Sequence, residues 1–327
     1  MTAAAPAADR PTVGVFIPSY NAARFVARAI RSVLAQTYAQ LELVVLDDAS
    51  TDDTADVVAP FLDDPRVRYV RHPANLGMAR NWNAGIASLA TPLICKLDAD
   101  DWYEPNFLAA AVDALEARPD AAFAFGGLRW VVAPDGDPDA ADVRVTEMRP
   151  YRRAWCVDGR QLRRNLARQC LIYGPTVCVR RWAYEQHGDF LETLRIHCDW
   201  EMWMRLSAHH PVAYLDATVA SALRHAENQT TAAARNAAVP RDLHRWLDLL
   251  DAGALPYALT PAERRDLESA MAKLVVGYLD RALRDDVAVT AEAALTFLLR
   301  TRVVPRWERP RLVAARAAVR RLGARRA

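Results

Sequence analysis

The chain has 327 residues, 52% of them hydrophobic and 25% charged, and a formal net charge of +2. These values describe an ordinary soluble globular protein with one large domain and an appendage, or with two domains. The five cysteines are scattered without a Cys-x-x-Cys pair, and no apolar run approaches the ~20 residues that cross a bilayer, so we expect a cytoplasmic protein without disulfides, zinc or a membrane span.

Short apolar strands alternate with helices over the first hundred residues, after an Ala- and Pro-rich start at residues 1–11 that we expect to be flexible. The strands are predicted at residues 12–17, 41–46, 67–70 and 93–97. The first strand is expected to stop at Pro18, which cannot donate to a ladder. Ser50 or Thr51 is expected to cap the helix after the second strand. This alternation predicts a parallel sheet covered on both faces, with ligands at the carboxyl ends of its strands.

Three carboxylates follow the fourth predicted strand within four positions, in Asp98-Ala-Asp100-Asp101. At the end of a buried strand, Asp98 and Asp100 would lie on the same side, roughly 7 Å apart. Hard oxygen ligands at this spacing suit one Mg²⁺ or Mn²⁺ ion and the phosphates that it carries. The plainer interpretation is a polar turn that ends a strand, because Asp is common in turns and helix caps.

Glycine-rich phosphate loops are missing from the sequence. It contains no Gly-x-Gly-x-x-Gly and no Gly-Lys-Ser/Thr, which disfavours a Rossmann dinucleotide site and a Walker-type loop. A nucleotide held at these strand ends would therefore have its diphosphate neutralised by a metal ion and by a basic side chain such as Arg80.

Six motifs in one order carry a resemblance that covers residues 12 to about 231. They are Pro18-Ser-Tyr20-Asn21, Asp47-Asp48-Ala-Ser-Thr-Asp-Asp-Thr54, Asn75-Leu-Gly77 with Asn81-Trp-Asn83, Leu97-Asp98-Ala-Asp100-Asp101, Tyr173-Gly-Pro-Thr-Val-Cys-Val-Arg-Arg181 with Gly188-Asp-Phe190, and Cys198-Asp199-Trp-Glu-Met-Trp-Met-Arg205. The set resembles the ordered motifs of family 2 inverting glycosyltransferases. The resemblance implies the α/β GT-A fold, a Rossmann-like, mostly parallel sheet flanked by helices.

The resemblance also implies a role for each matching position. The nucleoside would be bordered by Pro18, Tyr20 and Asp48, within motifs that also contribute Asn21 and Asn75 to the donor site. Asp98 would face the ribose or sugar, Asp100 would ligate the metal ion, and Asp199 would be the general base. Residues 12–101 would form the nucleotide-sugar half and residues 102–231 the acceptor half.

Asp199 is predicted just before or within the first turn of a helix. Its plainer role is helix capping, but a carboxylate at a helix N-terminus stays ionised, which also suits a base. The family more often has Glu-Asp where this chain has Cys198-Asp199, which leaves Asp199 as the first candidate and Glu201 as the second. Glu201 and Arg205 are spaced i, i+4 and are expected to pair.

Three other features of the acceptor half lead to expectations. Residues 133–142, after a predicted strand at 123–132, are acidic and rich in turn formers, and we interpret them as a loop or hairpin tip. Arg180 and Arg181 are expected to be a solvated helix start, with phosphate contact as the less favoured alternative. His225, in a segment that resembles the family's Arg-x-His, would complete the metal shell or bind a phosphate oxygen, or would be a structural hydrogen-bonding residue.

The C-terminal part, residues 232–327, is predicted to be helical. Thr260-Pro-Ala-Glu263 is a capping box that opens a helix to about residue 283, and Thr290 is expected to cap another. Residues 306–327 hold eight Arg and one Glu. This basic segment is either a solvated end or a helix on anionic lipid, which would give peripheral contact with the inner membrane face. Nucleic acid is disfavoured as a partner, because no aromatic residues interleave these arginines after Trp307.

We therefore expect metal-assisted transfer of a sugar, with inversion, from a nucleotide-sugar donor to a glycan, lipid-linked or small-molecule acceptor. UDP and dTDP sugars are the default donors from the resemblance alone. Two alternatives remain: a nucleotidyltransferase, which would release pyrophosphate, and a non-catalytic nucleotide-sugar-binding protein. The sequence predicts no oligomeric state.

Overall fold

The computed structural model describes residues 10–133, 135–140, 143–153, 155–225, 228, 237–285, 287–301, 303, 312 and 315–319. Most of the N-terminal stretch 1–11 and most of the Arg-rich segment 306–327 lie outside these residues, so the predictions for both remain open. None of the described helices is both long and apolar enough to span a bilayer.

The chain divides into two compact units. The first, here called the sheet unit, comprises Met1–Leu162, Ile172–Phe190 and Leu206–His225. The second, the helical unit, comprises Arg163–Leu171, Leu191–Arg205 and Ala226–Ala327. Two segments that the sequence analysis assigned to the acceptor half, residues 163–171 and 191–205, therefore group with the C-terminal helices.

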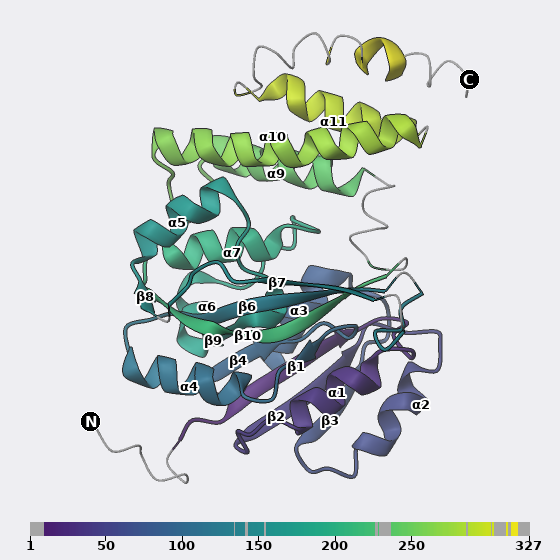
Figure 1. The fold of residues 1–327 in the computed structure, drawn as a ribbon, viewed down its shortest axis with the longest axis vertical. Coiled ribbons are helices and arrows are strands. Elements are labelled where there is room, and N and C mark those ends of the chain that lie inside the picture. The colour runs from purple at the N-terminus through teal and green to yellow at the C-terminus, as the bar shows by residue number, and fades with distance from the viewer. Residues whose placement is uncertain are drawn as a thin grey trace. The chain divides into compact units, whose positions relative to one another are not determined.

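The strands of the sheet unit form one ten-stranded sheet (Figure 1). They are β1 (Val13–Ser19), β2 (Leu41–Asp47), β3 (Val67–Arg71), β4 (Leu93–Lys96), β5 (Trp102–Tyr103), β6 (Phe123–Val132), β7 (Arg144–Met148), β8 (Trp155–Val157), β9 (Val177–Arg180) and β10 (Val212–Arg224). Their order is β3-β2-β1-β4-β9-β6-β10-β5, with β7 paired to β6 and β8 to β10. The first four strands are parallel, as predicted, and β9 joins them to the rest by antiparallel pairing with β4 and β6.

Helices cover both faces of the parallel part. The helices of this unit are α1 (Val26–Leu34), α2 (Thr54–Val58), α3 (Met78–Ser88), α4 (Phe107–Ala117) and α6 (Arg181–His187), with 3-10 turns at Ala59–Phe61 and Gly174–Thr176. Alternate residues of β1, such as Val15 and Ile17, share a buried cluster with α1 and α4. Phe16 faces the opposite side, against α3, where a Cβ on Gly85 would lie 2.4 Å from the Phe16 ring. The fold is the predicted α/β class.

Two local predictions about where β1 ends and how α2 begins were wrong. β1 continues through Pro18 to Ser19, because Pro18 lies beyond Phe16, the last residue of β1 that pairs with β4, so the ladder on that side needs no N–H from proline. Helix α2 begins at Thr54, and Ser50 caps nothing but accepts a hydrogen bond from the Asn21 N–H.

The two arginines at the start of α6 are half-buried, and not fully solvated as predicted. The Arg180 guanidinium donates to the carbonyls of Ala121 and Leu115, and Arg181 donates to the carbonyl of Leu89. Burial lowers the pKa of Arg180. These side chains satisfy carbonyls at the ends of α3 and α4 and in the loop after α4, and are therefore structural.

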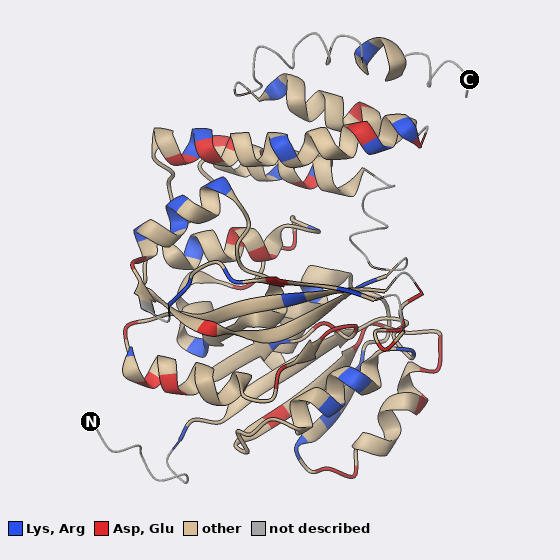
Figure 2. Ribbon diagram, in the orientation of Figure 1, with Lys and Arg blue, Asp and Glu red and all other residues tan. Residues whose placement is uncertain are grey.

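The helical unit contains α9 (Ala238–Asp251), α10 (Pro261–Arg284) and α11 (Ala288–Arg300), together with parts of α5 (Gly159–Arg168) and α7 (Cys198–Ser207). Figure 2 shows the basic residues of α5 in blue. The capping box is confirmed: Thr260 Oγ1 accepts the Glu263 N–H, and the Glu263 carboxylate accepts the Thr260 N–H. Thr290 lies inside α11, where its hydroxyl accepts the Ala237 N–H, so its predicted capping role was wrong.

Candidate active site

The strand order reverses direction next to β1, which pairs with β2 on one side and β4 on the other. In open α/β sheets, ligands bind outside the carboxyl ends of the strands at such a switch point. The three polar strand ends predicted from the sequence all lie here: the residues after β1, β2 and β4. The fold therefore explains why motifs far apart in sequence form one site.

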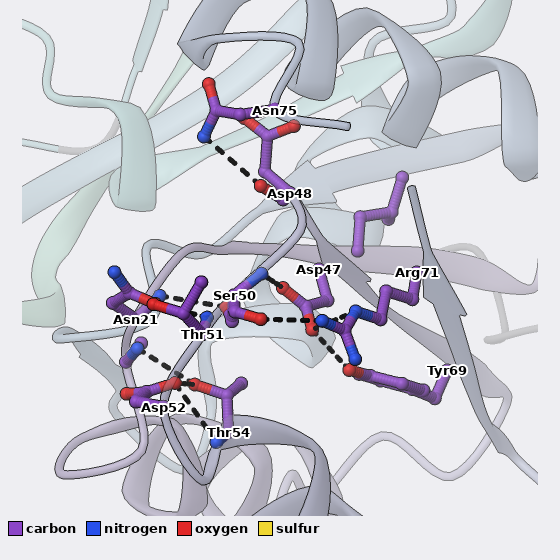
Figure 3. Close-up of polar contacts among 12 residues, drawn as sticks. Asn21, Asp47, Asp48, Ser50, Thr51, Asp52, Thr54, Tyr69, Arg71 and Asn75 are labelled. Carbon is purple, nitrogen blue, oxygen red and sulfur yellow. Dashed lines mark hydrogen bonds and ion pairs between the residues drawn. The ribbon is translucent and has the colours of Figure 1, made fainter. Parts of the chain in front are cut away.

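Two adjacent carboxylates at the end of β2 hold the surrounding loops (Figure 3). Asp47 is fully buried; it accepts the Ser50 N–H at 2.8 Å and the hydroxyl of Tyr69. Burial, together with the bond to Asp47, raises the pKa of Tyr69. Asp48 accepts the N–H groups of Leu76 and Gly77 at 2.6 and 3.0 Å.

The Asp48 carboxylate thus fixes the loop that leads into α3, and Asn75 adds a bond from its side-chain amide to the Asp48 carbonyl at 3.1 Å. Gly77, the residue before α3, has φ of +83°, a conformation that favours glycine. Contact of Asp48 or Asn75 with a nucleoside remains a prediction. What the structure shows is that both residues shape the loop that leads into α3.

The loop after β1 is tied to the loop after β2 by Asn21. Its side-chain oxygen accepts the Thr51 N–H at 2.8 Å, while its own N–H donates to Ser50 Oγ at 2.9 Å (Figure 3). Asn21 and Ala49 both have positive φ, +50° and +63°, although neither is glycine. Such strain persists where the surroundings over-determine the backbone, and it is common at binding sites. The neighbouring Tyr20 side chain is left 48% exposed, available to a ligand.

Asp98 is paired with a lysine that sequence reasoning overlooked. Lys96 Nζ lies 2.5 Å from Asp98 Oδ1 and 4.0 Å from the centre of the Trp82 ring, and Lys96 is only 5% exposed. A Cβ on Gly174 would lie 2.8 Å from Lys96 Nζ, so glycine makes room for this ion pair. The sequence does hold a signal for this residue, because Lys96 is one of only two lysines in the chain.

Asp100 and His225 meet although 125 positions separate them. His225 Nε2 lies 3.2 Å from Asp100 Oδ2, and Phe25 packs on the imidazole with ring centroids 4.5 Å apart. The short strand β5, directly after the acidic stretch, pairs with β10, which ends just before His225. Asp101 strengthens this junction by accepting the Leu223 N–H at 3.0 Å. Burial and the charges of its acidic neighbours raise the pKa of Asp101.

Asp100 and His225 could serve as ligands of a divalent cation whose other ligands come from substrate phosphates and water. Within the ranges that the structure describes, no three His, Cys, Asp or Glu side chains gather as a metal cluster. One carboxylate and one imidazole in contact nevertheless match the few protein ligands that Mg²⁺ or Mn²⁺ uses when substrate phosphates and water complete its shell.

Asp199 belongs to the helical unit, in the first turn of α7. Its Oδ1 accepts the Trp200 N–H at 2.6 Å. The predicted Glu201–Arg205 pair is confirmed at 2.9 Å, but it is a buried pair and not a surface one, since Glu201 is 0% and Arg205 2% exposed. Burial raises the pKa of Glu201, against the lowering effect of Arg205. Glu201 is therefore a core residue, which removes the second candidate for the base.

The remaining candidate, Arg80, is exposed on α3 and takes part in interactions of its own. Within the sheet unit, the structure brings together the end of β1, which contains Pro18, and the loops of Asn21, Asp48 and Asn75. It separately joins Asp100 to His225. A carboxylate of the helical unit, Asp242, was missed; no motif surrounds it in the sequence, and it is discussed below.

Comparison with solved structures supports the fold. The fold resembles crystal structures of S. aureus TarS in complex with UDP-GlcNAc (TM-score 0.67, 16% identity, 94% of this chain and 88% of that one). It also resembles mannosyltransferase PcManGT from Pyrobaculum calidifontis in complex with GDP-Man and Mn²⁺ (TM-score 0.56, 18% identity, 99% and 89%). The fold is thus of the GT-A type.

Sequence comparison gives the family. The family described as "Glycosyl transferase family 2" matches residues 14–155. The succinoglycan biosynthesis protein ExoU of Rhizobium meliloti is 34% identical over 64% of this chain and 59% of its own, and an uncharacterized glycosyltransferase of Nostoc is 37% identical over 32% and 33%. Residues 14–155 thus match glycosyl transferase family 2, and the region matched in either relative spans less than two thirds of that relative's length.

Proposed function

We propose that the protein is an inverting glycosyltransferase that moves a sugar from a nucleoside diphosphate, UDP or dTDP, to an acceptor hydroxyl or amine. The observation that carries the proposal is the contact between Asp100 and His225 beyond the end of β4, in a chain whose residues 14–155 match family 2. The neighbours crystallised with UDP-GlcNAc, or with GDP-Man and Mn²⁺, support a nucleotide-sugar donor. ExoU, named for succinoglycan biosynthesis, supports a glycan acceptor.

The residues of the sheet unit would bind the donor. The exposed Tyr20 ring offers a surface on which a nucleobase can stack, within loops that Asn21 and Asp48 hold rigid. Asp98, oriented by Lys96, would accept a hydrogen bond from a ribose or sugar hydroxyl. Arg80 would offset phosphate charge. A Mg²⁺ or Mn²⁺ ion held by Asp100 and His225 would stabilise the negative charge of the diphosphate leaving group.

Asp199 would act as the general base. Its carboxylate lies in the first turn of α7, where the helix dipole favours the ionised form. It would accept the proton of the acceptor hydroxyl or amine as that group attacks the anomeric carbon from the face opposite the leaving group. A metal-stabilised diphosphate leaves without protonation, so one base suffices, in contrast with the two carboxylates of a glycoside hydrolase.

The test is release of nucleoside diphosphate from a panel of UDP-, dTDP- and GDP-linked sugars with Mn²⁺ and a range of glycan acceptors. Asp199→Asn is expected to lower turnover by about 10²- to 10⁴-fold while donor affinity stays unchanged. Asp285→Asn, an exposed carboxylate just after α10, is the matched control. Unchanged turnover in Asp199→Asn would refute the base assignment.

The identity of the product separates the alternatives. A nucleotidyltransferase would release pyrophosphate, and a binding protein would release nothing while still being stabilised by the donor. In a thermal-shift screen, we expect UDP or dTDP to raise the melting temperature more with Mn²⁺ than without it. The increment from Mn²⁺ should disappear in His225→Ala.

A further inference from the structure

Asp242 is a buried carboxylate of the helical unit, on α9 and 5% exposed. Its Oδ1 accepts the N–H of Arg195 at 2.5 Å, and its Oδ2 accepts those of Ile196 and His197 at 3.1 and 2.8 Å. A fourth bond joins Oδ2 to Nδ1 of His197 at 3.0 Å. One side chain thus holds three consecutive backbone N–H groups and the imidazole of the last residue.

This arrangement requires an ionised carboxylate. A carboxylate accepts four donors only when it carries no proton of its own. Burial alone would raise the pKa of Asp242, but the hydrogen bonds from His197 and from the backbone outweigh it, and the pKa is lowered. Because Asp242 only accepts, Nδ1 of His197 must carry a proton, which fixes the tautomer of the neutral ring.

The three residues that Asp242 holds lead directly into α7. The carbonyl of His197 accepts the Glu201 N–H at 3.0 Å, the first hydrogen bond of the helix. Asp199 is the second residue of α7, two positions after the anchored segment. The first turn of a helix frays unless its N–H groups and entry are fixed. The hydrogen bonds between Asp242 and residues 195–197 therefore set the direction in which the Asp199 side chain leaves the backbone.

A second side chain of α9 holds the other side of the same turn. Trp246 lies four positions after Asp242, on the same face of α9. Its ring meets that of Trp200 edge-on, with centroids 5.4 Å apart at 81°. Trp200 Nε1 in turn donates to the Leu166 carbonyl at 2.9 Å. Asp199 thus lies between two contacts with α9. Residues 195–197 before it are bonded to Asp242, and Trp200 after it packs on Trp246.

We propose that Asp242 is a positioning residue for the transfer reaction, which fixes Asp199 as a base through residues 195–197. The inference rests on the proposed function, because it takes Asp199 as the base. It assigns to the C-terminal helices a catalytic task that no motif of the sequence indicates. Asp242 itself touches neither substrate nor metal in this scheme.

The test is a set of variants on α9, assayed as above with the fastest-reacting nucleotide sugar. Asp242→Ala removes all four bonds and is expected to lower kcat about 10- to 100-fold with the donor KM unchanged, because a misplaced base affects turnover and not donor binding. Asp242→Asn keeps one acceptor and should lie between Asp242→Ala and the wild type. Asp248→Ala is the matched control: it lies on the same helix and breaks a 2.6 Å bond to Arg300 instead. It should leave kcat unchanged.

A double-mutant cycle separates positioning from general damage. If Asp242 acts only through Asp199, Asp242→Asn should cost nothing further in an Asp199→Asn background. Hydrogen exchange adds a readout that needs no substrate: the N–H groups of residues 195–197 should exchange faster in Asp242→Asn and not in Asp248→Ala. An equal loss of kcat in both backgrounds, or unchanged kcat in Asp242→Ala, would overturn the inference while Asp199 remained the base. Wild-type turnover in Asp199→Asn would instead overturn the proposed function.

Discussion

The loops around β1 and β2 of the sheet unit and the first turn of α7 are held in different ways. Around β1 and β2, the supporting groups are themselves motif residues: Asn21 holds Thr51, and Asp48 holds the loop at Leu76. In α7, the supporting group is Asp242, 47 positions beyond Arg195 and outside every motif. The comparison teaches that a motif contains its own scaffold where parallel strand ends converge, and lacks it where a helix is packed by a later part of the chain.

The largest effect is expected inside the helical unit. Arg205→Met leaves the fully buried Glu201 without its cationic partner, which should lower the free energy of unfolding by about 3–5 kcal/mol. Urea denaturation of the purified variant measures this. The double variant Glu201→Leu/Arg205→Met removes both charges and should be closer to the wild type. If the single variant were as stable as the double, the pair would not be a buried ion pair in solution.

The next largest effect concerns chemistry in the sheet unit without loss of stability. Asp100→Asn removes the charge of the proposed metal ligand and is expected to lower turnover by about 10²-fold or more, with an unchanged denaturation midpoint. Asp101→Asn is the matched neighbour: an amide oxygen still accepts the Leu223 N–H, so turnover should fall far less. Equal losses in the two variants would show that the acidic stretch acts as a unit and that Asp100 has no separate role.

An intermediate effect tests whether the loops around β1 and β2 depend on their own carboxylates. Asp48→Ala leaves the N–H groups of Leu76 and Gly77 without their acceptor and should cost about 1–3 kcal/mol. It should also weaken the thermal shift produced by UDP. Asp53→Ala, an exposed carboxylate of the same motif whose side chain caps no helix, should cost much less. A similar loss in both would contradict the scaffold role of Asp48.

The sequence predicts the sheet unit well for a physical reason. Apolar runs and polar strand ends are local signals, and parallel strands bring their carboxyl ends to one edge, so Asp48, Asp98 and Asp100 could be placed without a structure. The pairing of Asp100 with His225 followed only from the resemblance, because it depends on β5 pairing with β10.

The helical unit is less readable from the sequence. Glu201 and Arg205 were predicted as a pair, but burial depends on tertiary packing, and i, i+4 spacing is the same on an exposed face. Asp242 has no such spacing, since its partners are backbone N–H groups, which every residue carries. Long-range bonds from a side chain to the backbone leave no pattern in a single sequence.

The smallest expected effect defines how far the catalytic influence of the helical unit extends. Thr260→Ala removes the hydroxyl that accepts the Glu263 N–H at the start of α10 and should cost about 1 kcal/mol of stability. Because the cap hydrogen bonds join Thr260 to Glu263, and not to Asp242 or Trp246, turnover by the folded protein should be unchanged, measured below the melting transition. A fall in kcat comparable to that of Asp242→Ala would mean that the whole helical bundle positions Asp199, and that the support is not concentrated on α9.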